Sequence, residues 1–385
     1  MATVANSFLD YVNNVTEKQP LSRAESYENI ISRNKYSMNA LMGSDMTEHM
    51  QTSHSFRANI YGKKVDQGRW HGGAGFTTQS EGTNTVFKLT SGMAYHYNYI
   101  RYDDEEVDSQ DGPGVGQAGG GGVWADTMKA KLQNAHQSNA DSFEDAIWSP
   151  ANQALMVDSP ERPMSIPYLV SEEGYLALQE DGSNVTSVYN ATAANLPTFD
   201  NARYTYANLG GNDQGGEDLF GSLDEAWLQA GFEPIPEHPE YGKGCKLNHI
   251  VFCSHWGIKV ILGALREGQT VWGEREVTPF GVRVGTMLFK PITALDTAAL
   301  YDDGSGGLAN EVDADKNGPR FYGINMDKTK LIFQNGHFQR MEKPVDMTAA
   351  GEPYSHHQNI KTKCQLWCSD RRSNFIVSPD AGAVA

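Results

Sequence analysis

The chain has 385 residues and carries 31 basic and 48 acidic side chains, which gives a formal net charge of −17 at pH 7. This length can build two or more substructures with cores of their own, and the negative charge excludes tight, non-specific binding to nucleic-acid phosphates. Because there is no signal segment, no membrane-spanning apolar run and only 4 cysteines, we expect a soluble protein from a reducing cytoplasm, with no membrane partner.

Residues 1–60 are polar and only weakly patterned. One or two short helices are compatible with "LSRAESYENIISRNKYSMNALMG", but nothing in this segment can build a core alone. We therefore expect an arm that packs on another part of the assembly.

The next segment, residues 61–122, contains two β-rich runs between glycine-rich flanks. The runs are "NTVFKL", which includes Phe87 and Leu89, and "MAYHYNYIRY", in which alternation puts Met93, Tyr95, Tyr97 and Tyr99 on one face. A β-excursion between glycine hinges predicts a projecting hairpin, over residues 85–102, that a neighbour orders. A simple surface hairpin is the alternative.

The clearest predicted helix covers residues 123–149. Apolar side chains recur in steps of three and four, and Pro150 ends the pattern. A helix of this length extends for about 40 Å, so it runs along much of a molecule whose radius of gyration is about 21 Å. The apolar stripe consists of Trp124, Met128, Leu132, Ala135, Phe143 and Ile147.

The segment after this helix predicts mixed α+β structure. "GSLDEAWLQAGF" is typical of a short helix with Ser222 as its cap and Gly231 at its end. "KLNHIVFCSHWGIKVILGALREG" indicates a strand, a turn and a helix capped by Ser254, and "FGVRVGTMLFKP" a strand pair or one bent strand.

Near the C-terminus, "IKTKCQLWCSDRRSNFIVSP" predicts a strand, a turn and a return strand. Cys364, Leu366 and Cys368 alternate with the residues expected on the other, solvent-facing side, so they belong to one buried face. The residues of that other side are Lys361, Lys363, Gln365 and Trp367. Four strand residues span about 13 Å, too far for a disulfide between the two cysteines, and buried free thiols behave as small hydrophobes. For Arg371 and Arg372 we expect anchoring of carboxylates or backbone carbonyls at the turn; contact with packaged DNA or a neighbouring subunit is the sharper alternative.

Motifs that carry chemistry are weak. Gly114 to Gly119 match G-x-G-x-x-G, but the acidic stretch "DDEEVDSQD" before them would repel a pyrophosphate. Asp313 to Gly318 resemble half of an EF-hand loop, yet Ile324 stands where a glutamate is needed. No histidine lies in a nucleophile or zinc motif. We therefore predict no enzyme activity and no catalytic, cofactor-binding or metal-binding residues.

The C-terminal third resembles the major capsid proteins of tailed bacteriophages, the HK97-like capsid family. The resemblance lies in "GPRFYGINMDKTKLIFQNGHFQRMEKP" and "PYSHHQNIKTKCQLWCSDRRSNFIVSP", and in "IWSPANQALMVDSPERPMSIPYLVSEEG" after the long helix, with "ITALDTAAL" as a weaker echo. These are packing patterns rather than catalytic motifs.

The resemblance implies an α+β, HK97-like capsid fold. Its expected parts are an N-terminal arm at 1–60, an extended loop at 61–122 that overlaps a neighbouring subunit, a peripheral domain at 123–220 with the spine helix at 123–149, an axial domain at 221–340, and a return to the peripheral sheet with the C-terminal tail at 341–385. It also implies hexamers and pentamers in an icosahedral virion shell around double-stranded DNA. Negative charge on the inner wall would keep the DNA from sticking.

The resemblance further implies assembly in the host cytoplasm with a scaffolding protein and a portal, and it leaves a decoration protein open. Two other functions stay as alternatives. One is a nucleotide-dependent cytoplasmic enzyme that uses the glycine-rich loop at 112–122. The other is a virion decoration or binding protein that uses the aromatic run at 85–102.

Overall fold

The structure is a computed structural model. It describes residues 37, 41, 55–61, 86–103, 121–158, 160–172, 187–192, 196, 199–208, 218–231, 249–267, 275–278, 281–284, 287–292, 312–313, 316–317, 319–343, 345–347 and 355–384. Most of the predicted arm at 1–60 and the glycine-rich loop at 112–120 therefore lie outside the described residues.

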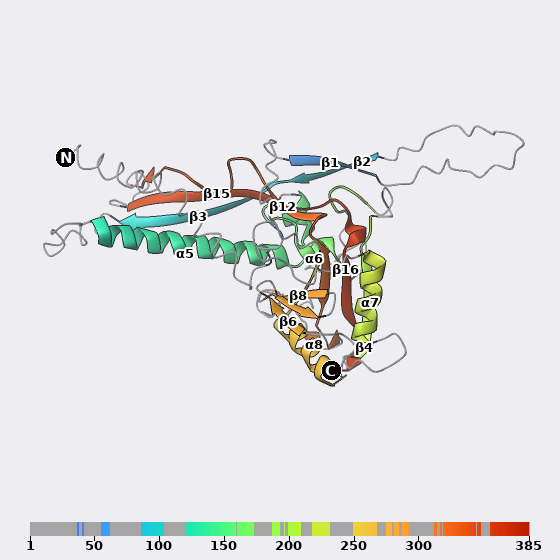
Figure 1. Cartoon of the computed structure of the whole chain (residues 1–385). Coiled ribbons are helices and arrows are strands. Elements are labelled where there is room, and N and C mark those ends of the chain that lie inside the picture. The colour runs from blue at the N-terminus through green and yellow to red at the C-terminus, as the bar shows by residue number, and fades with distance from the viewer. Residues whose placement is uncertain are drawn as a thin grey trace, which may run out of the picture.

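The molecule has two parts set at an angle (Figure 1). One is an elongated layer in which helix α5 (Gly121–Trp148) runs beside strands β3 (Ala94–Asp103) and β15 (Ser355–Cys368). The other is a sheet flanked by α7 (Leu219–Ala230) and α8 (His255–Glu267). The 28 residues of α5 correspond to a length of about 42 Å, in agreement with the predicted spine helix.

Strand β15 is the centre of a five-stranded sheet. It pairs with β3 in antiparallel register, from Ser355 opposite Asp103 to Cys364 opposite Ala94. The other members are β12 (Thr329–Phe333), β13 (Arg340–Met341) and β14 (Val345–Asp346), all of which pair with β15.

The predicted hairpin over residues 85–102 is wrong in its pairing. Its first run forms β2 (Val86–Gly92), which pairs with β1 (Ser55–Tyr61), whereas its second run forms β3 in the five-stranded sheet. Met93 alone separates β2 from β3, so the chain does not reverse between the two runs. The hairpin of this region is built by β1 and β2 instead.

The buried stripe of α5 agrees with the sequence pattern. Phe143 and Ile147 are almost fully buried, Ala135 is 8% exposed, and Leu132 is half-buried. Asn98 of β3 fastens the helix to the sheet, because its Nδ2 donates to the carbonyl of Ala135 at 3.1 Å. The side chains of Trp124 and Met128 lie outside the described part of the chain.

A seven-stranded sheet forms the second part, in the order β4-β16-β11-β5-β8-β7-β6. Alternate residues of β5 enter different cores: Ile250 and Phe252 pack with Trp148 of α5, and Val251 and Cys253 pack with α7 and α8. The strands are β4 (Ala202–Asn208), β5 (His249–Cys253), β6 (Arg275–Thr278), β7 (Gly281–Val284), β8 (Met287–Pro291), β11 (Phe321–Asn325) and β16 (Phe375–Val384).

The two sheets exchange strands across the predicted domain borders. β16 was expected to return with β15 to one sheet, but it pairs with β11 and β4. Conversely, β12 lies within the predicted axial segment and pairs with β15. The turn η5 (Arg371–Ser373) makes this crossing. Short remaining elements are η1 (Ala154–Asp158), α6 (Ile166–Leu169), β9 (Val312–Asp313) and β10 (Lys316–Asn317).

The residues predicted to begin and end α7 and α8 are confirmed in part. Ser254 caps α8, since its Oγ accepts from the backbone N–H of Gly257 at 3.0 Å, and Gly231 ends α7 with φ 65°. Ser222 is not the cap of α7. Asp218 is, because buried apolar residues extend the helix by one turn and the carboxylate accepts from Gly221 at 3.0 Å.

None of the described helices is long and apolar enough to cross a membrane.

Gly323 of β11 allows the sheet to pack closely. A Cβ on this residue would lie 2.3 Å from the ring of Phe375 on the paired strand β16.

Candidate functional site

The β1–β2 hairpin lies at the top of the view in Figure 1, above the region where the two parts meet. Its near end is anchored to the core, where the N–H of Thr90 donates to the carbonyl of Tyr189 and to Oδ1 of Asn190, both at 3.2 Å. Tyr189 and Asn190 have φ of 52° and 61°, so a left-handed turn presents these acceptors. The hairpin is therefore held at its base.

Two of the predicted inter-subunit residues belong to this anchor. Leu89 is fully buried in the chain's own core, and Phe87 is half-buried against the same core. Leu89 therefore stabilises the subunit that carries it and offers no surface to a neighbour.

The other three predicted residues, Tyr95, Tyr97 and Tyr99, lie on β3 and face away from α5. Tyr97 is 61% exposed and Tyr99 is 62% exposed. Directly across on β15, Nζ of Lys363 lies 4.4 Å from the ring centre of Tyr95, and Nζ of Lys361 lies 5.4 Å from that of Tyr97. Cation–aromatic pairs therefore run along this side of the sheet.

A buried polar network joins α5 to the N-terminal segment. Glu144 accepts from the backbone N–H of Ser37 at 2.7 Å and from its hydroxyl at 2.9 Å. The indole Nε1 of Trp148 donates to Glu144 Oε1 at 3.1 Å. All three side chains are buried, so the carboxylate is held by neutral donors rather than by water.

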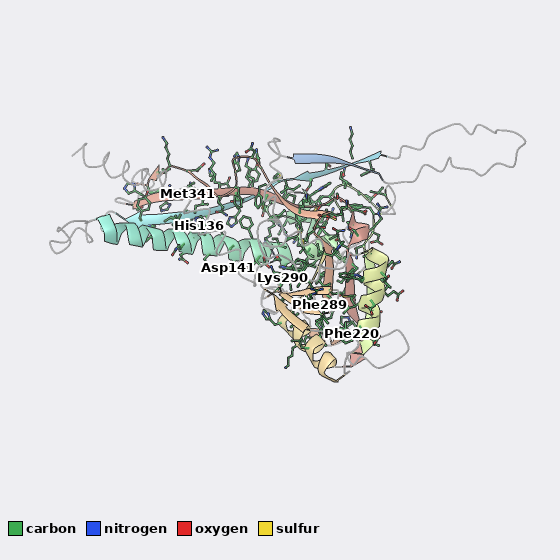
Figure 2. All side chains as sticks on the ribbon, in the orientation of Figure 1. His136, Asp141, Phe220, Phe289, Lys290 and Met341 are labelled. Carbon is green, nitrogen blue, oxygen red and sulfur yellow. The ribbon has the colours of Figure 1, made fainter. Side chains whose placement is uncertain are left out.

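Lys290 of β8 is the cationic neighbour of this network and is fully buried. Figure 2 labels it, beside Phe289, where β8 lies near the end of α5. Its Nζ has no hydrogen-bond acceptor among the described residues. Burial lowers the pKa of Lys290 from 10.5 to about 8, and the charge of Glu144 opposes part of this decrease. The pair therefore costs free energy to keep charged.

Strand β15 has the buried face that the sequence predicted. Cys364, Leu366 and Cys368 are each no more than 1% exposed, and both cysteines are free thiols. Burial raises the pKa of Cys364 to about 12 and also raises that of Cys368. These two thiols have a structural role in the core, since a reactive cysteine needs an accessible thiolate.

Near the C-terminal end of β15, buried and half-exposed residues no longer alternate, because both faces of the strand are covered there. Gln365 is fully buried: its Oε1 accepts from the N–H of Met164 at 2.6 Å, and its Nε2 donates to the carbonyl of Gly92 at 2.8 Å. Trp367 is 8% exposed and packs at 4.7 Å from the ring of Tyr189. The sequence pattern placed both residues on the polar face, which is wrong.

Arg371 is fully buried at the crossing between the two sheets. Its guanidinium donates to the carbonyls of Leu169 at 2.6 Å and Phe199 at 3.1 Å, and to Oδ1 of Asn201 at 3.1 Å. Arg372 instead lies at the surface and pairs with Asp370 at 2.7 Å. Both arginines thus make the anchoring contacts expected of the turn, and Arg371 has no surface for DNA.

The described residues offer little for catalysis. A cavity of about 480 Å³ lies between β3, α5 and residues 161–163, and its lining includes His96, Asp145 and Glu161. The ring of His96 lies 4.8 Å from that of Phe143 in a tilted arrangement, and burial lowers the pKa of His96. Within the described ranges, no group of three or more His, Cys, Asp or Glu side chains could hold a metal ion.

The other sequence motifs add no site. The G-x-G-x-x-G stretch lies outside the described residues. In the EF-hand-like stretch, β9 and β10 pair through Asp313 opposite Lys316, which makes a short hairpin.

Sequence reasoning missed the Glu144–Lys290 pair. Glu144 lies four residues before Trp148, between the stripe residues Phe143 and Ile147, and Lys290 interrupts the apolar run "MLFKP". A charge inside a buried pattern is the signal that could have identified both.

Comparisons with known proteins bear on the fold. No protein-family profile matches the chain, and no curated protein matches it in sequence. Among solved structures, a chain of the cyanophage A-1(L) capsid asymmetric unit is 10% identical, with 90% of this chain and 92% of that chain covered and a TM-score of 0.53. A chain from Mycobacterium phage Bobi is 9% identical over 87% and 88%, with a TM-score of 0.47. The mature capsid of bacteriophage PhiM1 is 15% identical over 85% and 82%, with a TM-score of 0.43.

The likeness to the cyanophage structure extends over nearly the whole of both chains. It shows that this chain has the HK97-like capsid fold predicted from its sequence. At 10% identity it shows the fold alone.

Proposed function

We propose that the chain is a major capsid protein of a tailed bacteriophage. Its copies would assemble into hexamers and pentamers, and these into an icosahedral head around double-stranded DNA. The observation that carries this proposal is the match of the fold to a phage capsid chain over 90% of this chain and 92% of that chain.

The shape of the subunit supports the proposal. The α5 layer extends well beyond the seven-stranded sheet, and the β1–β2 hairpin lies outside that sheet (Figure 1). Such extensions suit broad contacts between subunits, because they expose much surface for few residues. A structural role without enzyme activity also fits the described residues, in which buried polar groups hold elements together.

The negative net charge of the chain supports enclosure of DNA without tight binding to it. With a net charge of −17, the average surface repels phosphates, so a packaged duplex would stay mobile. A scaffolding protein and a portal would be needed for closure in the host cytoplasm. The proposal leaves a decoration protein open.

The hairpin offers a sharp test. Residues 62–85 join β1 to β2 and can be replaced by a short Gly-Ser linker, which keeps both strands. We expect wild-type protein, expressed alone or with neighbouring phage genes, to form particles in a density gradient. The linker variant should keep the wild-type circular dichroism and stay as small oligomers. Particles of normal size and yield from the variant would contradict a role of the hairpin in assembly.

The nucleotide-enzyme alternative is tested on the same material. It requires the wild-type chain to remain a monomer and to bind ATP or NAD in equilibrium dialysis. Binding by a monomer would replace the capsid proposal.

A further inference from the structure

One face of the five-stranded sheet carries an unusual mixture of aromatic and basic side chains. In antiparallel strands, residues directly opposite each other point to the same side of the sheet. The register pairs Tyr95 with Lys363, Tyr97 with Lys361, and Arg101 with His357. The tyrosine–lysine face consists of Tyr95, Tyr97, Tyr99 and Arg101 of β3, His357, Asn359, Lys361 and Lys363 of β15, Arg340 of β13 and Val345 of β14.

This face gathers exposed apolar surface. Four large apolar side chains are strongly exposed among the described residues, and three of them, Tyr97, Tyr99 and Val345, lie here with 61%, 62% and 51% of their surface accessible. Leu228 of α7 is the fourth. Clustered exposed aromatic residues mark interaction sites, because tyrosine buries a large area at low cost in side-chain entropy.

The opposite side of the same strands is closed. Ile100 and Tyr102 of β3 pack with Ala135 of α5 and Ile360 of β15 in one buried cluster. The tyrosines therefore lie on the outer face of the sheet, whereas α5 packs on its other face.

Charge indicates what binds there. The face carries Arg101, Arg340, Lys361 and Lys363, and nearby Glu342 pairs with Lys361 at 2.6 Å. Leaving out these five residues, the chain has 27 basic against 47 acidic side chains. The face is therefore a positive patch on a protein that is otherwise strongly negative, so a second copy of the chain would be attracted to it.

We propose that the tyrosine–lysine face is a docking surface for a second copy of this chain. This rests on the proposed function, which supplies a setting in which copies meet, and it names one side of the α5 layer as a subunit contact. Aromatic rings would supply the buried area, and the lysines and arginines would select the acidic surface of the neighbour. Four cations on a chain of net charge −17 are too few to favour a DNA duplex.

Site-specific photo-crosslinking tests this directly. A benzophenone-bearing phenylalanine derivative would replace Tyr97 in the full chain, and irradiated material would be analysed by denaturing gel and peptide mass spectrometry. We expect a chain-to-chain dimer as the main product. The control places the same group at Ser138, which is exposed on α5, and it should give at least fivefold less dimer.

Particle formation is scored separately by electron microscopy, so the two proposals can fail independently. Particles without a Tyr97 dimer would overturn the docking surface and leave the capsid proposal standing. A Tyr97 dimer without particles would support the docking surface and count against the capsid proposal. Crosslinks mainly to DNA or to another protein would also overturn the docking surface, because a different partner would occupy it.

Charge reversal gives a second readout. The variant Lys361→Glu/Lys363→Glu should raise the protein concentration needed for assembly at least tenfold, and added salt should weaken wild-type assembly. Lys259→Glu/Lys328→Glu, at exposed positions elsewhere, should leave that concentration within twofold. Equal effects of the two double variants would overturn the proposal. Thermal unfolding of both would confirm that they fold.

Discussion

The backbone N–H of Ser37 donates a hydrogen bond of 2.7 Å to Oε1 of Glu144, which lies 107 residues further along the chain. Both groups are buried where α5 meets the seven-stranded sheet, and Lys290 of that sheet lies close enough for its charge to interact with Glu144. Three distant segments thus meet at one carboxylate, and this makes Glu144 a key residue for the relative placement of the two parts.

Replacing this carboxylate by an amide should destabilise the subunit. In Glu144→Gln, one acceptor becomes a donor that faces the donors of Ser37 and Trp148, and Lys290 loses its opposite charge. We expect a loss of about 2–4 kcal/mol in the free energy of unfolding, measured by urea denaturation. The neighbouring Asp145 is exposed, so Asp145→Asn should change stability by less than about 0.5 kcal/mol. Equal effects of the two variants would contradict the network.

Lys290 should make stability depend on alkaline pH. Its pKa of about 8 in the folded state is below its ordinary value of 10.5, so the unfolded chain binds more protons between these values. The contribution of Lys290 therefore destabilises the fold fully below pH 8 and is relieved as pH rises towards 10.5, over a range of about 3 kcal/mol.

The variant Lys290→Met tests this pH dependence. It should be more stable than wild type at pH 7 and should lack the rise in unfolding free energy between pH 8 and pH 10. Lys259→Met, at an exposed position of α8, serves as the control and should follow the wild-type curve. A Lys290→Met variant that is less stable than wild type at pH 7 would show that the ammonium is a net stabiliser.

Arg371 and Arg372 form a matched pair for a second stability test. Arg371→Lys keeps the charge but cannot reach the three acceptors of the guanidinium fork, so we expect a loss of about 2–4 kcal/mol. Arg372→Lys changes only a surface ion pair and should cost less than about 1 kcal/mol. Unfolding midpoints of the two variants provide the measurement, and similar midpoints would contradict the anchoring role of Arg371.

The buried thiols should be inert in the folded chain. With its pKa raised to about 12, Cys364 has about one thiolate in ten thousand molecules at pH 8, and solvent does not reach it. Iodoacetamide labelling followed by mass spectrometry should leave Cys253, Cys364 and Cys368 unmodified in native protein and modify them in urea. Rapid native labelling of Cys364 would contradict the burial of this strand.

Local patterns in the sequence predicted much of this fold. The stripe of α5 and the alternation around Cys364 were readable because each element buries one face in a regular period. The pairing of β2 and β3 was not readable. β3 pairs with a strand more than 250 residues later, and nothing within residues 85–102 distinguishes that partner from a hairpin. The crossing of β16 between sheets was missed for the same reason.

The site residues show a similar division. Arg371 was assigned an anchoring role because a paired arginine at a turn needs acceptors. The tyrosines of β3 were placed correctly on one face but assigned to the wrong element. Glu144 and Lys290 were passed over because a charge is normally assigned to solvent, and only the packing of α5 on β8 shows that these two are buried together.

The most direct test of the central claim is negative-stain electron microscopy of the wild-type chain, expressed with the neighbouring genes of its genome and purified by sedimentation. The capsid proposal predicts closed, uniformly sized shells, or rings of five and six subunits where closure is incomplete. A homogeneous monomer under the same conditions, with no rings or shells at any protein concentration, would contradict it.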